Sequence, residues 1–319
     1  MKISKILWII LCSSCYSVYA ATPSVTLPGG VNLGATSFYD GFGGRQGDSI
    51  WQTYVGYTDA QDMKNQQGDN ALPGSSSLTS TVVINQYIHM FKDSKPILGG
   101  NPGIEINVPY IFLDGDTQFP VDLKTNSAGV GDPTVALFIQ HDPLIRNQQP
   151  FFSDRISVGV MSPLGDYDKN KDFNPGSNYF SLFVYAAMTF QFNPKWSLSL
   201  RPYYYYNFQN DSPASSMPLD ADIKNTQSGQ FFTTNYNLGY QLNDHLALGI
   251  NGYYLKQLTN DKVNGETLKN SKEQVFAIGP AAMLDYGRNK FYLTAHKESQ
   301  VENRFKAESN MTLRWLHIF

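Results

Sequence analysis

The chain has 319 residues, of which only 16% are charged and 14% are aromatic, and its formal net charge at pH 7 is −3. Disorder does not fit this composition, because so many aromatic side chains can bury extensive apolar surface. Nucleic acid is not expected as a partner without a dense Lys/Arg patch, and beyond the N-terminus no apolar run reaches the ~18 to 20 residues of a membrane-spanning helix.

The first twenty residues have the pattern of a secretory signal peptide. Lys2 and Lys5 precede a short apolar run, and Val18-Tyr19-Ala20 forms a small-x-small cleavage site. We therefore predict a signal peptide over residues 1–20, cleaved after Ala20; an uncleaved anchor would need a longer apolar run. Both cysteines lie in this segment, so the exported chain can form neither a disulfide nor a thiolate metal site.

Residues 21–48 form a Gly-rich segment that precedes the first predicted strand. If the strands close into a barrel, this segment can fold into the lumen as a plug. The plug candidates are Asn32, Phe38, Tyr39 and Phe42.

From residue 49 onward, apolar and polar side chains alternate in about twelve segments, which predicts strands because successive side chains of a strand point to opposite faces. No run with helical period competes with them. The predicted strands are 49–58, 79–91, 103–113, 132–141, 154–164, 178–193, 195–209, 229–242, 245–257, 273–286, 289–297 and 303–318.

The last strand shows the alternation most clearly. Even positions from 304 to 314 are charged or polar, whereas odd positions from 305 to 315 are mostly apolar. Charges in the middle of a strand suit a watery lumen, and the opposite face suits lipid. The lumen-lining candidates on this basis are Glu105, Arg155, Arg201, Tyr203, Tyr205, Asn235, Asn251, Arg304, Glu308 and Arg314.

The predicted connections alternate in length. Those after odd-numbered strands are mostly long and polar, whereas three after even-numbered strands are tight turns, at 193–195, 243–244 and 287–288. This asymmetry is typical of outer-membrane barrels. We therefore predict an all-β fold, a transmembrane antiparallel β-barrel of about twelve strands over residues 49–319, with fourteen strands as the alternative. A soluble sandwich or lipocalin-like barrel also alternates, but the long aromatic faces and mid-strand charges favour the membrane barrel.

The C-terminus supports the same prediction. Trp315 and the terminal Phe319 resemble the signal that barrel-assembly machinery recognises, although His317 stands where an apolar residue is expected. The expected partners are thus outer-membrane lipid, the assembly machinery during biogenesis and a small solute, and the expected location is a Gram-negative-type outer membrane.

Four segments, 32–42, 129–133, 251–261 and 275–280, resemble the family of meta-pathway phenol-degradation proteins. The most specific part is the Gly-Tyr-Tyr-x-x-Gln-Leu-Thr segment that begins at Gly252, followed by Ile278-Gly279-Pro280. The resemblance implies an outer-membrane transporter, similar in role to the long-chain fatty-acid and aromatic-hydrocarbon channels. It also implies the solute class, since the family name reflects genomic association with aromatic catabolism.

The sequence offers only weak catalytic and metal-binding patterns. No two of the five histidines are three to five residues apart, so no metal is predicted. An outer-membrane phospholipase would need a Ser–His pair, but Ser309 and His317 are eight residues apart on one strand face, and no Gly-x-Ser-x-Gly motif occurs. The acidic stretch 166–172 lacks the Gly and Glu of a calcium loop. We therefore predict no enzyme and no cofactor.

The tract 203–206 consists of four tyrosines and has two interpretations. Tyr203 and Tyr205 share the register of Arg201, so they either offer rings to an aromatic solute or simply fill the lumen. The lumenal charges either line a path or form ion pairs that close it, because twelve strands lie between barrels filled by side chains and open pores.

The predicted function is passive uptake of small hydrophobic or aromatic molecules, which pass the plug or leave through a lateral gap in the wall. A general diffusion pore for polar solutes and a structural or adhesive barrel remain alternatives.

Overall fold

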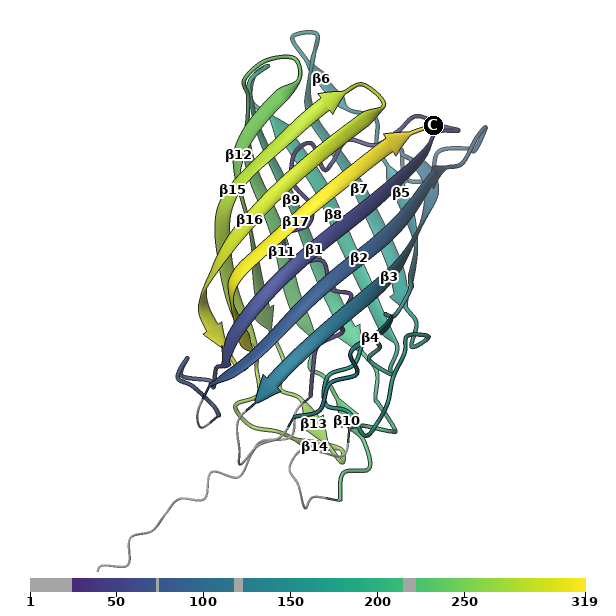
Figure 1. Cartoon of the computed structure of the whole chain (residues 1–319). Coiled ribbons are helices and arrows are strands. Elements are labelled where there is room, and N and C mark those ends of the chain that lie inside the picture. The colour runs from purple at the N-terminus through teal and green to yellow at the C-terminus, as the bar shows by residue number, and fades with distance from the viewer. Residues whose placement is uncertain (1–24, 73–74, 118–122, 215–221) are drawn as a thin grey trace, which may run out of the picture.

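The computed structural model describes residues 25–72, 75–117, 123–214 and 222–319, so the predicted signal peptide lies outside the described residues. Long antiparallel strands form a closed barrel (Figure 1). Each strand pairs with the next long strand along the chain, and the last strand pairs with the first, which closes the wall. Within the described residues, no helix is long and apolar enough to cross a membrane.

The barrel consists of twelve long strands, and each corresponds to one predicted segment. They are β1 (Ser49–Met63), β2 (Ser76–Met90), β3 (Asn101–Thr117), β5 (Thr134–Gln140), β7 (Gln149–Met161), β8 (Ser181–Gln191), β9 (Trp196–Asn207), β11 (Phe231–Gln241), β12 (Leu246–Gln257), β15 (Gln274–Tyr286), β16 (Asn289–Glu302) and β17 (Phe305–Ile318).

Within the part of the chain that the structure describes, five short strands lie outside this ring. β4 (Ala128–Val130) pairs with β3, and β6 (Leu144–Arg146) pairs with β7. The other three, β10 (Thr226–Gln227), β13 (Lys262–Val263) and β14 (Glu266–Thr267), form a small separate sheet.

The two sides of the wall differ as the alternation predicts. In β5, Ala136 is 2% exposed and its neighbour Leu137 is 57% exposed; in β7, Ser157 is 1% exposed and Val158 is 62% exposed. Exposed aliphatic and aromatic side chains recur on the outer side of the strands. Such a continuous apolar surface is stable only against lipid.

The two ends of the barrel also differ. We call the end with the tight connections 192–195, 242–245 and 287–288 the turn end; the longer connections 91–100 and 141–148 also lie there. The opposite end, at which β1, β3, β7, β9 and β12 end, is the loop end. The C-terminus lies at the turn end, and the small sheet of β10, β13 and β14 lies at the loop end (Figure 1).

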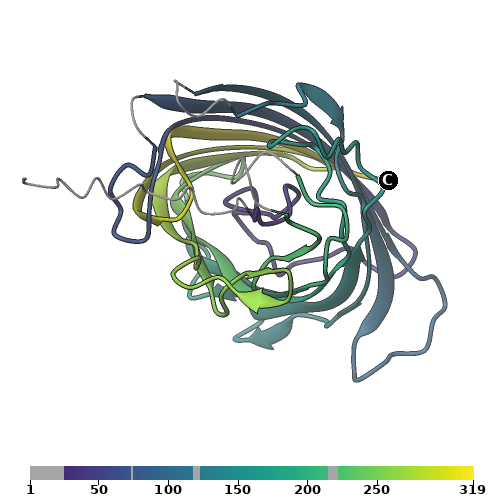
Figure 2. The same cartoon turned by 90° about the horizontal axis from the view of Figure 1, so that it is seen from below.

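Residues 25–48, here called the lumenal segment, run inside the barrel (Figure 2). At the loop end the hydroxyl of Tyr179 donates to the carbonyl oxygen of Thr26 at 2.7 Å. At the turn end the segment leads into β1 at Ser49, whose carbonyl oxygen accepts from the backbone N–H of Phe319. The segment therefore traverses the lumen from one end to the other.

A notch in the wall accommodates this segment. Gly239 of β11 and Gly249 of β12 lie opposite each other, and the ring of Phe38 packs on both. A Cβ atom at Gly239 would lie 2.8 Å from the Phe38 ring, and one at Gly249 would lie 3.0 Å from it. The absence of side chains at these two positions makes room for Phe38, which is only 2% exposed.

Candidate functional site

The structure places most of the predicted lumen-lining residues on the inner side of the wall. In an open pore, polar side chains on this side would contact water, whereas here they are buried. The set with an exposed fraction of at most 7% comprises Glu105, Arg155, Arg201, Tyr203, Tyr205, Asn235, Asn251 and Arg314.

The other two predicted lumen-lining residues lie near the loop end. The guanidinium of Arg304 lies 3.6 Å from the carboxylate of Glu273. Glu308 differs from the prediction: its side chain is 44% exposed and pairs with Lys306. The pairing of β1 with β17 shifts by one residue at this point, so that Ala307 is buried in its place. A β-bulge of this kind reverses which side chains face inward.

Polar contacts along its length hold the lumenal segment to the wall. The side-chain oxygen of Asn235 accepts from the backbone N–H of Gly34 at 2.8 Å, and its amide group donates to Asn32 at 2.9 Å and to Thr36 at 2.8 Å. Further along, Thr189 accepts from the N–H of Gly41 at 2.9 Å. Strands β8 and β11 thus bind the segment from two parts of the wall.

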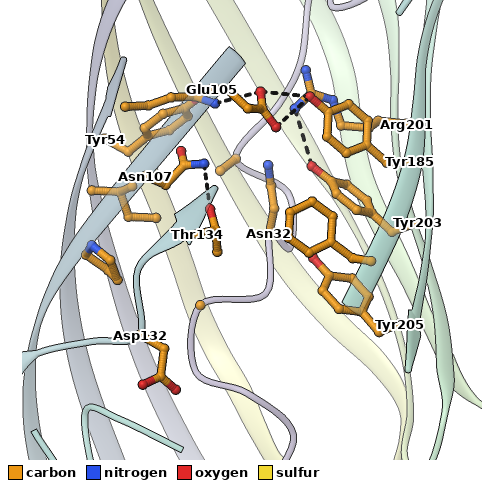
Figure 3. Close-up of a pocket in the computed structure, with 16 residues that line it drawn as sticks. Asn32, Tyr54, Glu105, Asn107, Asp132, Thr134, Tyr185, Arg201, Tyr203 and Tyr205 are labelled. Carbon is orange, nitrogen blue, oxygen red and sulfur yellow. Dashed lines mark hydrogen bonds between the residues drawn. The ribbon is translucent and has the colours of Figure 1, made fainter. Parts of the chain in front are cut away.

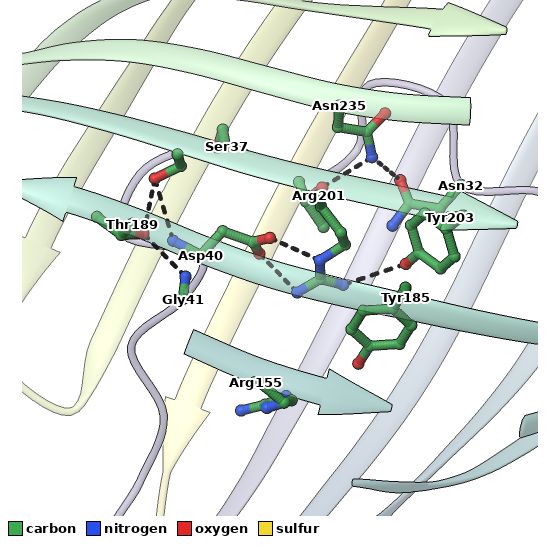
Figure 4. Close-up of polar contacts among 12 residues, drawn as sticks. Asn32, Ser37, Asp40, Gly41, Arg155, Tyr185, Thr189, Arg201, Tyr203 and Asn235 are labelled. Atoms are coloured by element: carbon green, nitrogen blue, oxygen red, sulfur yellow. Dashed lines mark hydrogen bonds and ion pairs between the residues drawn. The ribbon is translucent and has the colours of Figure 1, made fainter. Parts of the chain in front are cut away.

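The strongest of these contacts is an ion pair inside the barrel (Figure 4). Arg201 of β9 donates from Nε and Nη2 to the two carboxylate oxygens of Asp40, both at 2.6 Å, and from Nη1 to the hydroxyl of Tyr203. Both charged side chains are less than one tenth exposed. Two parallel charge-assisted bonds of this kind fix both the position and the orientation of a side chain.

The four plug candidates all belong to this segment. Asn32 is bound to Asn235, and Phe38 fills the notch at Gly239 and Gly249. The hydroxyl of Tyr39 donates to Gln241 at 3.0 Å, and its ring centroid lies 6.1 Å from that of Phe42.

The lumen contains a central cavity of about 60 Å³. One side is aromatic: the ring centroids of Tyr185 and Tyr203 are 4.7 Å apart, those of Tyr203 and Tyr205 are 5.6 Å apart, and Phe183 packs against the same cluster. Figure 3 shows these tyrosines facing Glu105 and Asn107 across the space. The lumenal segment contributes Gly30, Asn32 and Ala35 to the lining.

The polar side of this cavity centres on Glu105, which is 3% exposed. The hydroxyl of Tyr185 lies 2.9 and 2.8 Å from its two carboxylate oxygens, and the amide of Gln86 donates at 3.3 Å. Arg155 lies 3.9 Å away and stacks over the ring of Phe138. The buried carboxylate of Asp132 lines the cavity as well, so that two cationic and three anionic side chains, counting the pair of Asp40 and Arg201, lie at or beside the aromatic space.

A second cavity, of about 530 Å³, lies towards the turn end and is lined by Gly43, Gly44, Asn101, Gln140 and His141 among others. Gln140 and Arg155 link its lining to Glu105 of the central cavity. Gln140 accepts from Nε of Arg155 at 3.1 Å and donates to the carbonyl oxygen of Gly41 at 2.9 Å, and Arg155 in turn reaches Glu105.

Several residues of this arrangement were not singled out from the sequence. Tyr185 follows the inward register of Ser181, Phe183 and Thr189 in the predicted strand 178–193, so the alternation alone could have identified it. Gln140 likewise follows the inward register of β5, whereas Asp40 carried no such signal, because its role depends on Arg201, far away in the chain.

The described residues contain no group of three or more His, Cys, Asp or Glu side chains that could hold a metal ion. A Ser–His contact that sequence reasoning missed occurs between Oγ of Ser49 and Nδ1 of His89, 3.0 Å apart. Among the described residues, no carboxylate or amide side chain forms a hydrogen bond with this ring, whereas the histidine of a hydrolytic triad has such a third partner.

A closed antiparallel barrel with an apolar outer surface and a polar, aromatic lumen defines the class of outer-membrane β-barrels. The chain belongs to the family described as "Putative MetA-pathway of phenol degradation", whose profile matches residues 60–315. This confirms the family suggested by the sequence motifs.

Solved structures show the same fold. The crystal structure of an outer membrane channel from Pseudomonas putida F1 has a TM-score of 0.75 and 17% sequence identity, and the match covers 89% of this chain and 100% of that one. The β domain of the Bordetella autotransporter BrkA has a TM-score of 0.50 and 9% identity, with 86% and 100% covered. No curated protein sequence matches the chain.

Proposed function

We propose that this protein is an outer-membrane channel for passive uptake of small hydrophobic or aromatic molecules, and that it is not an enzyme. The observation that carries the proposal is the aromatic side of the central cavity, built from Phe183, Tyr185, Tyr203 and Tyr205 inside the barrel lumen. Aromatic rings bind other rings in offset or edge-to-face geometry, so this surface suits an aromatic solute. Membership of a family described by phenol degradation supports the same solute class.

The lumenal segment acts as a plug in this proposal, and the structure corresponds to the closed state. The central cavity of about 60 Å³ is smaller than the ~150 Å³ that accommodates benzene in an engineered protein. A ring can therefore enter only when Gly30 and Asn32 move away from the wall. The solute then passes the layer formed by Gln140, Arg155 and Gly41 into the cavity at the turn end, or leaves through a lateral gap.

Permeation into liposomes tests the proposal. Purified protein should admit small phenols faster than sugars of equal size, because the aromatic cavity binds the former. Ion conductance typical of an open pore, together with equal sugar permeation, would favour a general diffusion pore. A barrel that admits neither class of solute would favour a structural or adhesive role.

Export belongs to the same proposal. Residues 1–20 act as the signal peptide, with cleavage after Ala20, and the barrel-assembly machinery recognises the terminal strand, in which Trp315 and Phe319 are exposed. N-terminal sequencing of protein purified from outer membranes should begin at Ala21.

A further inference from the structure

The carboxylate in the central cavity has hydrogen-bonding capacity that the described residues do not fill. A carboxylate offers about four acceptor sites. Glu105 receives one short bond, from Tyr185, and a longer one from Gln86 at 3.3 Å, while Arg155 at 3.9 Å is beyond hydrogen-bond distance. The single hydroxyl proton of Tyr185 lies between the two carboxylate oxygens, so acceptor sites remain available beside the cavity.

This acceptor lies directly beside the aromatic surface. Tyr185 belongs to both, since its hydroxyl binds Glu105 and its ring packs on Tyr203 at 4.7 Å between centroids. A solute ring that stacks against Tyr203 or Tyr205 can therefore direct a substituent at the Glu105 carboxylate (Figure 3).

The charges around the cavity restrict the nature of that substituent. Glu105 faces Arg155 and Asp40 is bound to Arg201, while the buried carboxylate of Asp132 also lines the cavity. An anionic solute would add a negative charge to a cavity that two buried carboxylates already line, which is costly in a buried site. A pure hydrocarbon would displace water from the carboxylate and return no hydrogen bond. A neutral hydroxyl group avoids both costs.

We propose that the central cavity is a recognition site for neutral hydroxylated aromatics, in which Glu105 accepts the hydrogen bond of the solute hydroxyl. This inference rests on the proposed function and refines it, because it distinguishes phenols from aromatic hydrocarbons and aromatic acids. Glu105 is the specificity-determining residue, and Tyr185 is its competing internal donor.

Three ligands of the same ring size test the proposal: p-cresol, toluene and p-toluate, which differ in carrying a hydroxyl, nothing or a carboxylate. Calorimetric titration of the full-length mature protein in detergent at pH 7 should show p-cresol binding at least about tenfold more tightly than either of the others, since a hydrogen bond to a charged group is that strong. Equal affinities for p-cresol and toluene would overturn the inference.

Two variants test whether Glu105 accepts the hydrogen bond of the solute hydroxyl. Glu105→Gln should reduce the preference for p-cresol over toluene to less than about threefold, because the acceptor loses its charge. Tyr185→Phe should bind p-cresol at least as tightly as the wild type, because the competing hydroxyl is gone. A loss of p-cresol binding in Tyr185→Phe equal to that in Glu105→Gln would overturn the role of Glu105. Tyr204→Phe, on the outer side of β9, is the matched control and should leave all three affinities unchanged.

The same ligands in the liposome assay separate this inference from the proposed function. If p-cresol and toluene both permeate quickly and bind equally, the channel remains and hydroxyl recognition fails. If neither permeates, the proposed function itself fails. Should Glu105→Gln not fold, the wild-type ligand series and Tyr185→Phe still decide the matter.

Discussion

A buried ion pair fixes the position of the lumenal segment. The ion pair of Asp40 with Arg201 joins this segment to β9 through two bonds of 2.6 Å. A buried ion pair contributes little net stability, but loss of one partner leaves an unpaired buried charge and costs about 3 to 5 kcal/mol. The pair therefore selects one position of the segment among many that apolar contacts would allow.

Asp40→Asn should loosen the lumenal segment without unfolding the barrel. We expect backbone amides of residues 30–42 to exchange hydrogen at least about tenfold faster, because local opening no longer breaks the ion pair. Mass spectrometry of the exchanged peptides measures this. Asp244→Asn, in an exposed turn, is the control and should leave the exchange unchanged. Equal exchange in wild type and Asp40→Asn would mean that the pair does not hold the segment.

Acidic residues at the loop end make stability depend on pH. Burial raises the pKa of the Glu273 carboxyl from 4.5 to about 7 and that of Asp261 from 3.8 to about 6. A raised pKa favours the protonated carboxyl in the folded state. Protonation therefore stabilises the folded protein, and this contribution is complete at pH values below the ordinary pKa of each group. It is lost as the pH rises through 6 and 7.

The free energy of unfolding in urea should therefore be greater at pH 5 than at pH 8. The contribution of Glu273 is up to about 3 kcal/mol, because each pKa unit corresponds to about 1.4 kcal/mol. Glu273→Gln should flatten the pH dependence, whereas Glu266→Gln, exposed in β14, should not. Wild-type pH dependence in Glu273→Gln would contradict this assignment.

At the scale of elements, the lumenal segment and the wall are built to fit each other. Phe38 occupies the notch at Gly239 and Gly249, and Gly41 lies so close to β7 and β8 that a Cβ atom there would be 2.3 Å from the carbonyl oxygen of Ser153. Close packing of this kind excludes water from the contacts at Phe38 and Gly41.

Deletion of residues 22–46 tests whether the segment closes the barrel. Ion conductance in planar bilayers should rise severalfold, because the strands continue to form a wall and the space within it becomes available to water. Circular dichroism should retain the β-sheet signal of the wild type. Unchanged conductance in a folded deletion variant would show that the wall side chains alone close the lumen.

At the scale of the whole molecule, the two ends of the barrel differ in the length of their connections. Three tight turns and the C-terminus lie at one end, together with the longer connections 91–100 and 141–148, and most of the long connections lie at the other end (Figure 1). In outer-membrane barrels short turns face the periplasm and long loops face outward.

An epitope inserted between Asn264 and Gly265, in the turn between β13 and β14, should therefore bind antibody on intact cells. The same epitope between Asn243 and Asp244, in the turn between β11 and β12, should bind only after the outer membrane is permeabilised. Flow cytometry measures both, and the reverse pattern would invert the orientation proposed for the barrel.

The twelve strands and the side on which most residues lie could be predicted from the sequence, because alternation is a local property of a strand. Several strand ends could not, since β1 continues to Met63 instead of 58 and β7 begins at Gln149 instead of 154. The predicted strand 132–141 begins only at Thr134, since the side chain of Asp132 accepts from the backbone of Gly165 and Ser177 instead of extending the wall. The predicted strand 289–297 continues to Glu302.

Glu308 shows that the alternation within one strand does not always determine which face of the wall a residue occupies. Its alternation with Arg314 placed it in the lumen, but the bulge opposite Ala60 turns it outward. A bulge depends on how two strands pair, and the strands concerned, β1 and β17, lie at opposite ends of the chain.

The sequence by itself therefore determined the barrel, its two ends and the chemical difference between its faces, since each depends on neighbouring residues. Only the tertiary structure decided which inward residues meet. Asp40 binds Arg201, 161 positions away, and Tyr185 binds Glu105, 80 positions away. Closure of the barrel brings these side chains together across the lumen, and the register of every strand pair in the ring determines which of them can touch.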